Sequence, residues 1–205
     1  MLVLSEAELS QIRSELDSSD AKVRNRAIER LAARYPAVEP PAGLAALITP
    51  TIQDKNSSPP ERSNAVKALG VWGGMDAVPI LVEVLRDESV FFFTRKDALQ
   101  MLGNFLDDRA AAAIAGALSD GRLRGDAAAA LKQLGPLAER AVAEHLTSRD
   151  RGELLEAIQI LKEIGTLESI PALEETARQE KSVASQVDDA IRQVRQRASN
   201  TSAAK

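Results

Sequence analysis

The chain has 205 residues, of which 44% are apolar and only 3% aromatic, a formal charge of −4 and no cysteine. The length allows one large domain or two small ones with a real core, and the small aliphatic side chains favour close helix–helix contact over a sheet sandwich. The acidic balance argues against a general nucleic-acid binder, and the lack of cysteine excludes disulfides and thiolate metal sites.

The N-terminus predicts a helix and no export signal. It has no basic region, and its apolar run, Leu2 to Leu4, is too short for a signal peptide. No later segment is long enough to span a bilayer, so a cytoplasmic protein is expected, although a fragment of a larger chain would look the same. Ser5 and Glu8 form the pattern of a capping box, and a stripe follows at Leu9, Ile12 and Leu16. The segment is interpreted as an N-terminal cap helix.

The middle of the chain repeats itself. Four segments share one frame, and their marker glycines, Gly70, Gly103, Gly135 and Gly165, are spaced 33, 32 and 30 residues apart. An earlier copy begins at Asp20, with Ala32 in the glycine position, and a half-copy at Val183 to Arg197 follows the last repeat.

Each repeat is predicted to be two helices. The first carries an apolar stripe and ends at its glycine, as at Gly103, and after a short turn a second stripe begins. Asp87 and Asp120 are predicted to end second helices, and Asp54 holds a similar place. A unit this short cannot bury its apolar face alone, so neighbouring units must stack into one core.

The segment "DAKVRNRAIERL", from Asp20 to Leu31, resembles the D-x-x-V-R-x-x-A-x-x-x-L signature of HEAT repeats. "ALGVWGGMDAVPILVEVLRD" is similar to the HEAT-like units of phycobilin lyases and many bacterial proteins. The resemblance extends from about Asp20 to Gln196. It implies an all-α, right-handed α-solenoid of about five HEAT-like helix pairs with terminal cap helices, with residues 1–198 as a single domain and residues 199–205 as a disordered tail.

Two departures from the family pattern stand out. The family arginine is matched by Arg24, Arg62 and Arg95 but is replaced in later repeats by Ala127, Ala157 and Val187, so any Asp–Arg ladder is expected to weaken toward the C-terminus. In the first repeat, Pro50 is expected to interrupt and kink the second helix.

The aromatic residues are few, and three of them are consecutive. Trp72 takes a frame position that is apolar in every repeat and is therefore interpreted as packing. Phe91, Phe92 and Phe93 precede the normal start of a first helix. The favoured interpretation is a plug between two repeats, and the alternative is an exposed anchor for a partner or for a second copy of the chain. Of the aromatic residues, Phe93 is expected to face outward.

Charges on the second helices offer a candidate binding surface. The resemblance implies that second helices line the concave face, where Glu83, Glu144, Glu174, Arg86 and Arg178 fall. One interpretation is a solvated surface with Glu83–Arg86 and Glu174–Arg178 pairs, and the other is an acidic rim for a basic peptide. Small residues in the third repeat either allow close helix packing or leave a shallow groove: Ala112, Ala115, Gly116 and Ser119.

Enzyme chemistry finds little support in the sequence. His145 is the single histidine, so no multi-histidine metal site exists; it is expected to be a plain helix residue, with a pH-sensitive contact as the alternative. Basic clusters lie at Arg24 to Arg34 and at Arg192 to Arg197, so the HEAT-like DNA glycosylases are an enzyme class to consider. Such an enzyme needs a basic concave channel with aromatic and carboxylate groups aimed at a base, whereas here the aromatic residues are packed or clustered at one junction and the charge balance is acidic.

The sequence therefore predicts a non-enzymatic protein–protein interaction scaffold without a cofactor. Its partner is expected to be another protein or a peptide, bound through the concave face or the Phe91–Phe93 edge, with neither nucleic acid nor membrane involved and with self-association through the phenylalanines left open. The alternative is a bilin lyase-like or small-ligand-binding enzyme on the same repeat fold.

Overall fold

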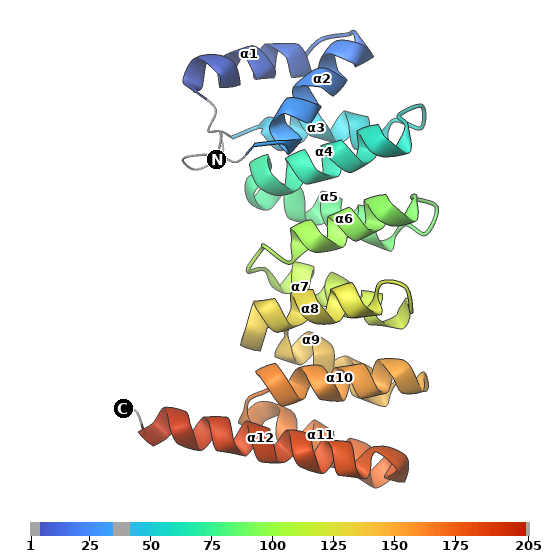
Figure 1. The fold of residues 1–205 in the computed structure, drawn as a ribbon, viewed down its shortest axis with the longest axis vertical. Helices are drawn as coiled ribbons and strands as arrows, with labels where there is room; N and C mark the ends of the chain where they lie inside the picture. Colours follow the sequence, from blue (N-terminus) through green and yellow to red (C-terminus); the bar gives the residue numbers. More distant parts are fainter. Residues whose placement is uncertain (1–4, 35–41, 204–205) are drawn as a thin grey trace. The chain divides into compact units, whose positions relative to one another are not determined.

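The computed structural model describes residues 5–34 and 42–203, and their regular structure is helical throughout (Figure 1). The apolar run Leu2–Leu4, part of the first repeat (35–41) and the last two residues (204–205) lie outside the described residues. The α-helices are α1 (Glu6–Leu16), α2 (Ala21–Ala32), α3 (Leu44–Gln53), α4 (Pro59–Trp72), α5 (Ala77–Arg86), α6 (Phe92–Leu102), α7 (Asp108–Gly116), α8 (Arg124–Leu134), α9 (Glu139–Ala143), α10 (Arg151–Ile164), α11 (Ile170–Gln179) and α12 (Ala184–Ala203).

The order of the helices confirms the expected repeat architecture. In the described part of the chain, five helix pairs follow one another, from α2/α3 to α10/α11, with α1 before them and α12 after them. The capping box that starts α1 is present, since Glu8 N donates to Ser5 Oγ (3.3 Å) and Ser5 N donates to Glu8 Oε2 (2.9 Å). Helix α12 continues to Ala203, past the expected domain end at residue 198.

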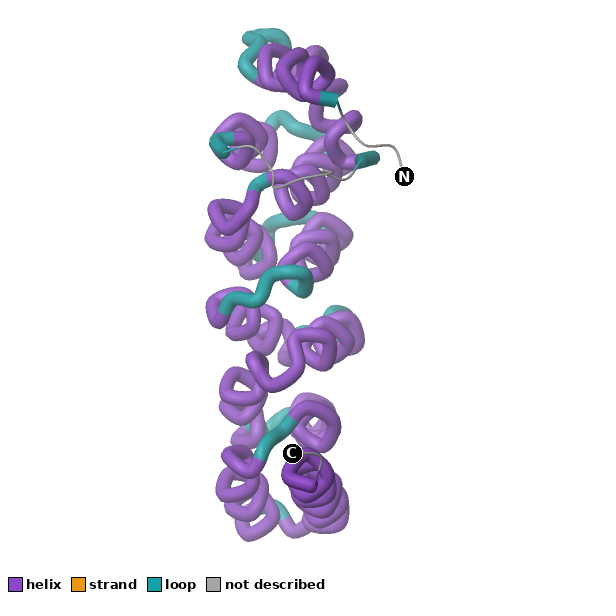
Figure 2. Tube along the Cα trace, turned by 90° about the vertical axis from the view of Figure 1, so that its left-hand side faces the viewer, coloured by secondary structure: helices purple, strands orange, loops and turns teal. Residues whose placement is uncertain are grey.

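The chain forms two compact units, unit 1 (Met1–Phe105) and unit 2 (Leu106–Lys205). In unit 1, α4 packs against α2, α3 and α6; in unit 2, α10 packs against α8, α9 and α12. Within each unit the helices lie in two layers (Figure 2). A single domain for residues 1–198 stays a prediction. Among the described residues, no helix is long and apolar enough to cross a membrane.

Both cores are aliphatic and rich in alanine, as the composition indicates. Fully buried side chains include Ile28, Leu31, Leu69 and Leu99 in unit 1, and Ile114, Leu118, Leu131 and Leu161 in unit 2. Each such side chain contributes roughly 1.5–3 kcal/mol when it leaves water. Buried alanines in the first helices, such as Ala65, Ala98 and Ala157, let neighbouring helices approach.

Gly70 has a packing role that differs from the expected one. Gly103, Gly135 and Gly165 end their helices as predicted, but α4 continues past Gly70 to Trp72 and is capped by Gly73. A Cβ at Gly70 would lie 2.5 Å from the Cβ of Met101 on α6. Because Gly70 has no side chain, α4 can lie this close to α6.

Arginines tie first helices to the connection that precedes them. Arg24 Nη1 donates to the Ser18 carbonyl oxygen (2.7 Å), Arg62 Nη2 to that of Asp54 (2.9 Å) and Arg95 Nε to that of Leu85 (3.0 Å). These carbonyl groups lie at or beyond the ends of helices, where partners within the helix are missing.

The same contact recurs in unit 2 with a different residue. Arg124 Nε donates to the Leu118 carbonyl oxygen (2.7 Å), from a position three residues before the frame equivalent Ala127. The contact that the family arginine makes in unit 1 is therefore present in the fourth repeat as well. The frame position itself is Ala127, as the sequence shows, and Arg124 makes a comparable contact from one turn earlier.

Two further sequence predictions concern unit 1. Trp72 is 2% exposed, and its Nε1 donates to the carbonyl oxygens of Leu31 (3.0 Å) and Arg34 (3.3 Å), which confirms its packing role. The expected interruption at Pro50 was wrong, because α3 continues through this residue to Gln53. Thr51 and Ile52, directly after the proline, are buried and hold the last turn against its neighbours.

Substituting Gly70 tests the close approach of α4 and α6. The Gly70→Ala variant should lose about 1–3 kcal/mol of unfolding free energy, because the added methyl group overpacks the contact with Met101. The measurement is urea denaturation followed by circular dichroism.

The matched control is Gly125→Ala in α8, where a Cβ would meet no atom within 4 Å. It should leave stability unchanged or raise it by up to about 1 kcal/mol, because alanine restricts the unfolded chain more than glycine does. Equal effects of the two substitutions would contradict the packing role of Gly70.

Candidate partner-binding site

Charged side chains on the first helices are largely used within each unit. Lys67 Nζ lies 3.4 Å from Asp97 Oδ1 and joins α4 to α6. In unit 2, ion pairs join α8 to α10 and α10 to α12: Lys132–Glu163 (2.7 Å) and Lys162–Asp189 (2.6 Å). Such exposed or half-buried pairs add little stability each, but they neutralise this layer of helices.

The two basic clusters are also bound within the chain. Arg30 pairs with Glu15 (2.9 Å) and Arg34 with Glu8 (3.2 Å), so they join α2 and the residues directly after it to α1. At the other end, Arg192 pairs with Asp189 (3.1 Å), Arg195 with Glu174 (3.5 Å), and Arg197 donates to the carbonyl oxygens of Lys162 and Gly165. These contacts leave few cations for a nucleic-acid backbone.

Second helices keep several unpaired charges. Glu83 and Arg86 on α5 are exposed and, within the described residues, pair neither with each other nor with another charge, so the expected pair is absent. Glu144 is likewise exposed. The expectation of a Glu174–Arg178 pair was wrong, because neither residue binds the other.

Both members of that expected pair find other partners. Arg178 binds Glu175 (2.5 Å), one position nearer along the helix, and Glu174 lies beside Arg195 of α12. In α11 the charges are therefore largely neutralised, whereas those of α5 remain available.

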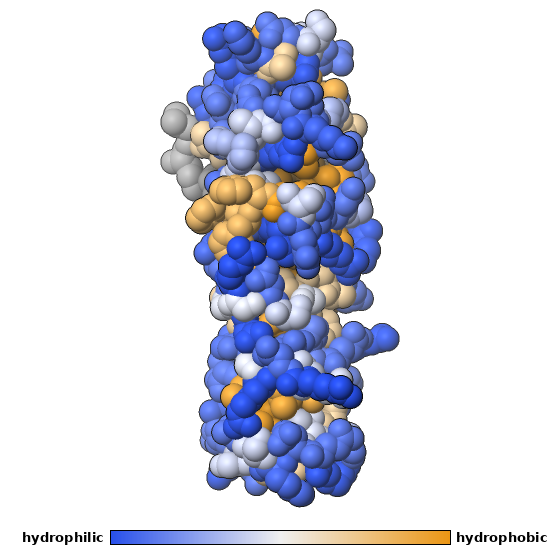
Figure 3. All heavy atoms as spheres, turned by 90° about the vertical axis from the view of Figure 1, so that its right-hand side faces the viewer, coloured by the Kyte–Doolittle hydropathy of each residue, from blue (hydrophilic) through white to orange (hydrophobic). Residues whose placement is uncertain are grey.

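The three phenylalanines lie at the start of α6 and are largely exposed. Phe91 is the residue that caps α6 and is 52% exposed, Phe92 is half-buried and Phe93 is 61% exposed. The ring centre of Phe93 lies 5.6 Å from that of Phe91 and 5.4 Å from that of Phe92. We call these three residues, Phe91, Phe92 and Phe93, the phenylalanine patch. Figure 3 shows apolar surface on the side of unit 1 that carries the α5–α6 connection.

These exposures decide between the two sequence interpretations. A plug between repeats would require buried rings, so this favoured interpretation was wrong for Phe91 and Phe93. The expectation that Phe93 faces outward while Trp72 does not is confirmed. Large aromatic side chains in contact with each other on a surface are typical of interaction sites.

Local structure explains why the rings point outward. Asp87 ends α5, and its Oδ1 accepts from Ser89 N (2.9 Å) and Ser89 Oγ (2.6 Å), which forms a turn before α6. Thr94 and Arg95 then take the inward face of the first turn and are 1% and 7% exposed. Phe91 is the N-cap, and its ψ of 133° keeps it outside the helical turn, so it does not share the face of this buried pair. Phe93 is helical but lies on the face of the exposed Gln100, seven residues later, and therefore points toward solvent.

A groove lies beside the patch, at the ends of α3, α4 and α5. Its volume is about 340 Å³, and its residues are Ile52, Gln53, Lys55, Arg62, Ile80, Glu83, Val84, Asp87, Ser89 and Val90. Val90 directly precedes Phe91, so the groove and the phenylalanine patch are neighbours within unit 1. The groove thus joins Glu83, a residue singled out from the sequence, to the aromatic residues.

Asp87 is electrostatically stabilised at the edge of this groove. The hydroxyl and backbone N–H of Ser89 donate to its carboxylate, with Arg95 and Arg62 nearby, and together they hold the pKa of Asp87 below its usual value. Asp87 therefore stays ionised under ordinary conditions, while its hydrogen-bonding capacity is used by the turn.

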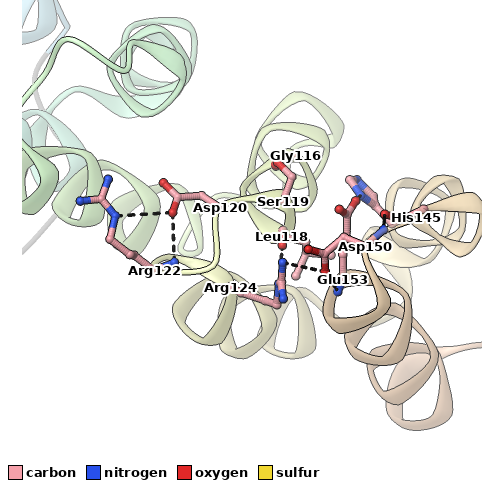
Figure 4. A network of polar contacts seen from close by, with 10 residues as sticks. Gly116, Leu118, Ser119, Asp120, Arg122, Arg124, His145, Asp150 and Glu153 are labelled. Atoms are coloured by element: carbon pink, nitrogen blue, oxygen red, sulfur yellow. Dashed lines mark hydrogen bonds and ion pairs between the residues drawn. The ribbon is translucent and has the colours of Figure 1, made fainter.

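Unit 2 holds a polar network that the sequence did not indicate (Figure 4). His145 Nδ1 lies 2.6 Å from Glu153 Oε1, and both side chains are mostly buried. Arg124 joins this region by its contact with Asp150 Oδ1 (3.1 Å). The sequence expectation of a plain helix residue did not include this contact, which forms because the repeat connection brings Glu153 back beside His145.

The network does not have the composition of a catalytic or metal site. Among the described residues, no hydroxyl group hydrogen-bonds to His145, as nucleophilic catalysis would require, and no group of three or more acidic, histidine or cysteine side chains could hold a metal ion. The network connects α10 to the preceding repeat and is interpreted as structural.

The small residues of α7 and of the turn after it divide between buried and exposed positions. Ala115 is 1% exposed and packs, whereas Ala112, Gly116 and Ser119 are exposed. A second groove of about 280 Å³ is formed by Asp108, Ala111, Ala112, Leu137, Arg140, Ala141 and Glu144. It contains Glu144, but none of its residues is an exposed aromatic.

Comparisons with known proteins agree with this architecture. Residues 45–135 match the family model for HEAT repeats, which confirms the resemblance over that stretch. No curated protein matches the chain.

Similar solved structures are also helical repeat proteins. An engineered protein from the Northeast Structural Genomics Consortium is 20% identical, with a TM-score of 0.53, over 93% of this chain and 95% of its own. A designed armadillo repeat protein is 17% identical, with a TM-score of 0.53, over 91% and 99% of the two chains. A phycocyanin lyase complex from a Nostoc species is 20% identical over 91% and 93%, with a TM-score of 0.43. At these identities the comparisons establish the fold alone.

The turn that presents the patch can be tested by pH. Since the folded-state pKa of Asp87 lies below its ordinary value of 3.8, its carboxylate stabilises the fold above that value, and this stabilisation is lost as the pH falls through the folded-state pKa. The Asp87→Asn variant should therefore be less stable than the wild type at pH 7, with the difference shrinking toward about pH 3. Urea denaturation across this range measures it.

Glu88→Gln is the control, because Glu88 is exposed and has no hydrogen-bond or ion-pair partner in the part of the chain described. Its stability should stay close to that of the wild type at each pH. A difference for Asp87→Asn that is constant from pH 7 to about pH 3 would show that the effect does not come from the ionised carboxylate.

Proposed function

We propose that this chain is a protein-binding scaffold that holds its partner at the phenylalanine patch of unit 1. The single observation that carries the proposal is the pair of mutually contacting aromatic side chains, Phe91 and Phe93, left 52% and 61% exposed at the start of α6. Burying such rings against a partner contributes more than most surface contacts do, and aromatic residues are common among the residues that dominate binding.

Three further observations support the proposal. A stack of packed helices holds the patch on a rigid element, since Thr94, Arg95 and Ala98 anchor α6 from inside. The unpaired charges Glu83 and Arg86 belong to the adjoining helix α5 and can add specificity. Repeat folds of this kind present extended binding surfaces in general.

The remaining sequence candidates lie in unit 2. The expected partner-binding roles of Glu144, Glu174 and Arg178 stay predictions, and the proposal does not depend on them. Arg178 and Glu174 already form ion pairs within the chain, which lowers their availability.

The alternative, a bilin lyase-like enzyme, has no specific observation in its favour. It rests on the resemblance of the repeats alone, and the groove beside the exposed aromatics, with a volume of about 340 Å³, is at the lower end of the range for ligand pockets. A titration with a tetrapyrrole separates the two classes, because a lyase-like protein would form a stoichiometric complex with a changed absorbance.

Removing the rings tests the proposed function. A photoreactive amino acid is placed at position 88, next to the patch, and cross-linked partners are recovered from the native cell by affinity purification. The double variant Phe91→Ser, Phe93→Ser should lose partner recovery by more than about tenfold, since each aromatic anchor contributes about 2 kcal/mol or more. Its circular dichroism and unfolding midpoint should stay near the wild type, because exposed substitutions change stability by about 0.5 kcal/mol.

The control is Leu167→Ser, which removes a 55% exposed apolar side chain from unit 2. It should leave partner recovery unchanged. If the double variant recovers the same partners as strongly as the wild type, the phenylalanine patch is not the binding site.

A further inference from the structure

The groove beside the phenylalanine patch has an apolar interior. Ile52, Ile80, Val84 and Val90 come from three different segments of unit 1 and meet there, and Ile52 and Val84 keep 8% and 5% of their surface exposed. Its volume of about 340 Å³ is at the lower end of the range for ligand pockets. This volume can hold one or two side chains of a partner. It is too small to hold a whole secondary-structure element of a folded partner.

Two opposite charges on the groove lack partners. Lys55, after α3, and Glu83, on α5, are exposed and form no ion pair with any described residue. The other two charged residues of the groove are engaged, because Asp87 accepts from Ser89 and Arg62 donates to Asp54. A ligand therefore meets one available cation and one available anion, on different structural segments.

Arg62, a further residue of the groove, has one guanidinium nitrogen engaged and one without a partner. Its Nε is buried and has no hydrogen-bond partner, while its Nη2 is held by the Asp54 carbonyl oxygen (2.9 Å). A buried donor without an acceptor costs free energy, and such groups are rare in folded proteins. Because Nε itself has almost no exposed surface, this cost belongs to the packing of Arg62 and not to the groove.

A second copy of the chain fits the patch less well than a peptide does. The exposed parts of Phe91 and Phe93 amount to roughly 200 Å² together, whereas a stable interface needs about 800 Å² from each partner. A peptide needs no such area, because an anchor in a groove and a few flanking contacts suffice for its binding.

We propose that the groove binds a short linear segment of the partner protein, with an apolar side chain placed between an acidic and a basic residue. The apolar side chain packs on Ile80 and Val84 alongside the phenylalanine patch, the acidic residue lies opposite Lys55, and the basic residue lies opposite Glu83. The proposal deepens the proposed function and rests on it.

Selection from a library tests this specificity. The full-length protein is used to select from random short peptides displayed on phage, and enriched peptides are synthesised with a fluorophore and titrated by anisotropy. Enriched sequences should share an apolar residue flanked by opposite charges. The Lys55→Glu and Glu83→Lys variants should each weaken binding by about tenfold, because a like charge then faces the peptide.

Two further measurements make the test specific. The double variant Lys55→Glu, Glu83→Lys should bind a peptide in which the two charges are exchanged, and should bind it more tightly than the wild type does. The matched controls are Lys22→Glu and Glu29→Lys, which reverse exposed charges on α2, away from the groove residues. They should leave the affinity unchanged within about twofold.

Three outcomes would overturn the proposal: no enriched peptide, peptides insensitive to both charge reversals, or a dimer in light scattering that dissociates in the Phe91→Ser, Phe93→Ser variant. The last would make a second copy the occupant. If partners still cross-link beside the patch while no peptide binds, the proposed function stands and only the peptide proposal fails. If neither is seen, both fail.

Discussion

The structure depends on one constraint: a helix pair of this length cannot bury its own apolar stripe, so each first helix must be covered by its neighbours. In unit 1, α4 meets this need by lying against α2, α3 and α6. Close contact requires small residues at the crossing, and at Gly70 even a methyl group would overlap Met101 of α6. Buried alanines serve the same need elsewhere, and they explain a core that has almost no aromatic residue.

Stacking also determines which polar groups remain available. First helices use their charges on each other, through pairs such as Lys67–Asp97 and Lys132–Glu163, and their arginines bind carbonyl groups of the connections. The end of α5 and the start of α6 are different. There the chain leaves two exposed aromatic rings, and the unpaired charges of Lys55 and Glu83 lie on the groove beside them. This concentration of available side chains supports a binding role.

Sequence patterns could predict the helix pairs, the packing of Trp72 and the outward direction of Phe93, because apolar periodicity and the repeat frame reflect burial directly. They failed where the outcome depends on distance across repeats. The contact of Gly70 with Met101, the use of Arg124 in place of Ala127 and the pairing of His145 with Glu153 all depend on how far one helix lies from the next. The groove could not be predicted from the sequence for the same reason, because it is formed by three separate segments.

Trp72 gives the molecule an internal reporter. It is the sole tryptophan of the sequence, it lies in unit 1, and its indole is both buried and hydrogen-bonded to the end of α2. Its fluorescence therefore follows the melting of unit 1 alone, whereas the far-ultraviolet dichroism follows the helices of both units. Coincidence of the two signals would mean that the repeats unfold as one cooperative body, and separation would mean that each half of the chain carries its own stability.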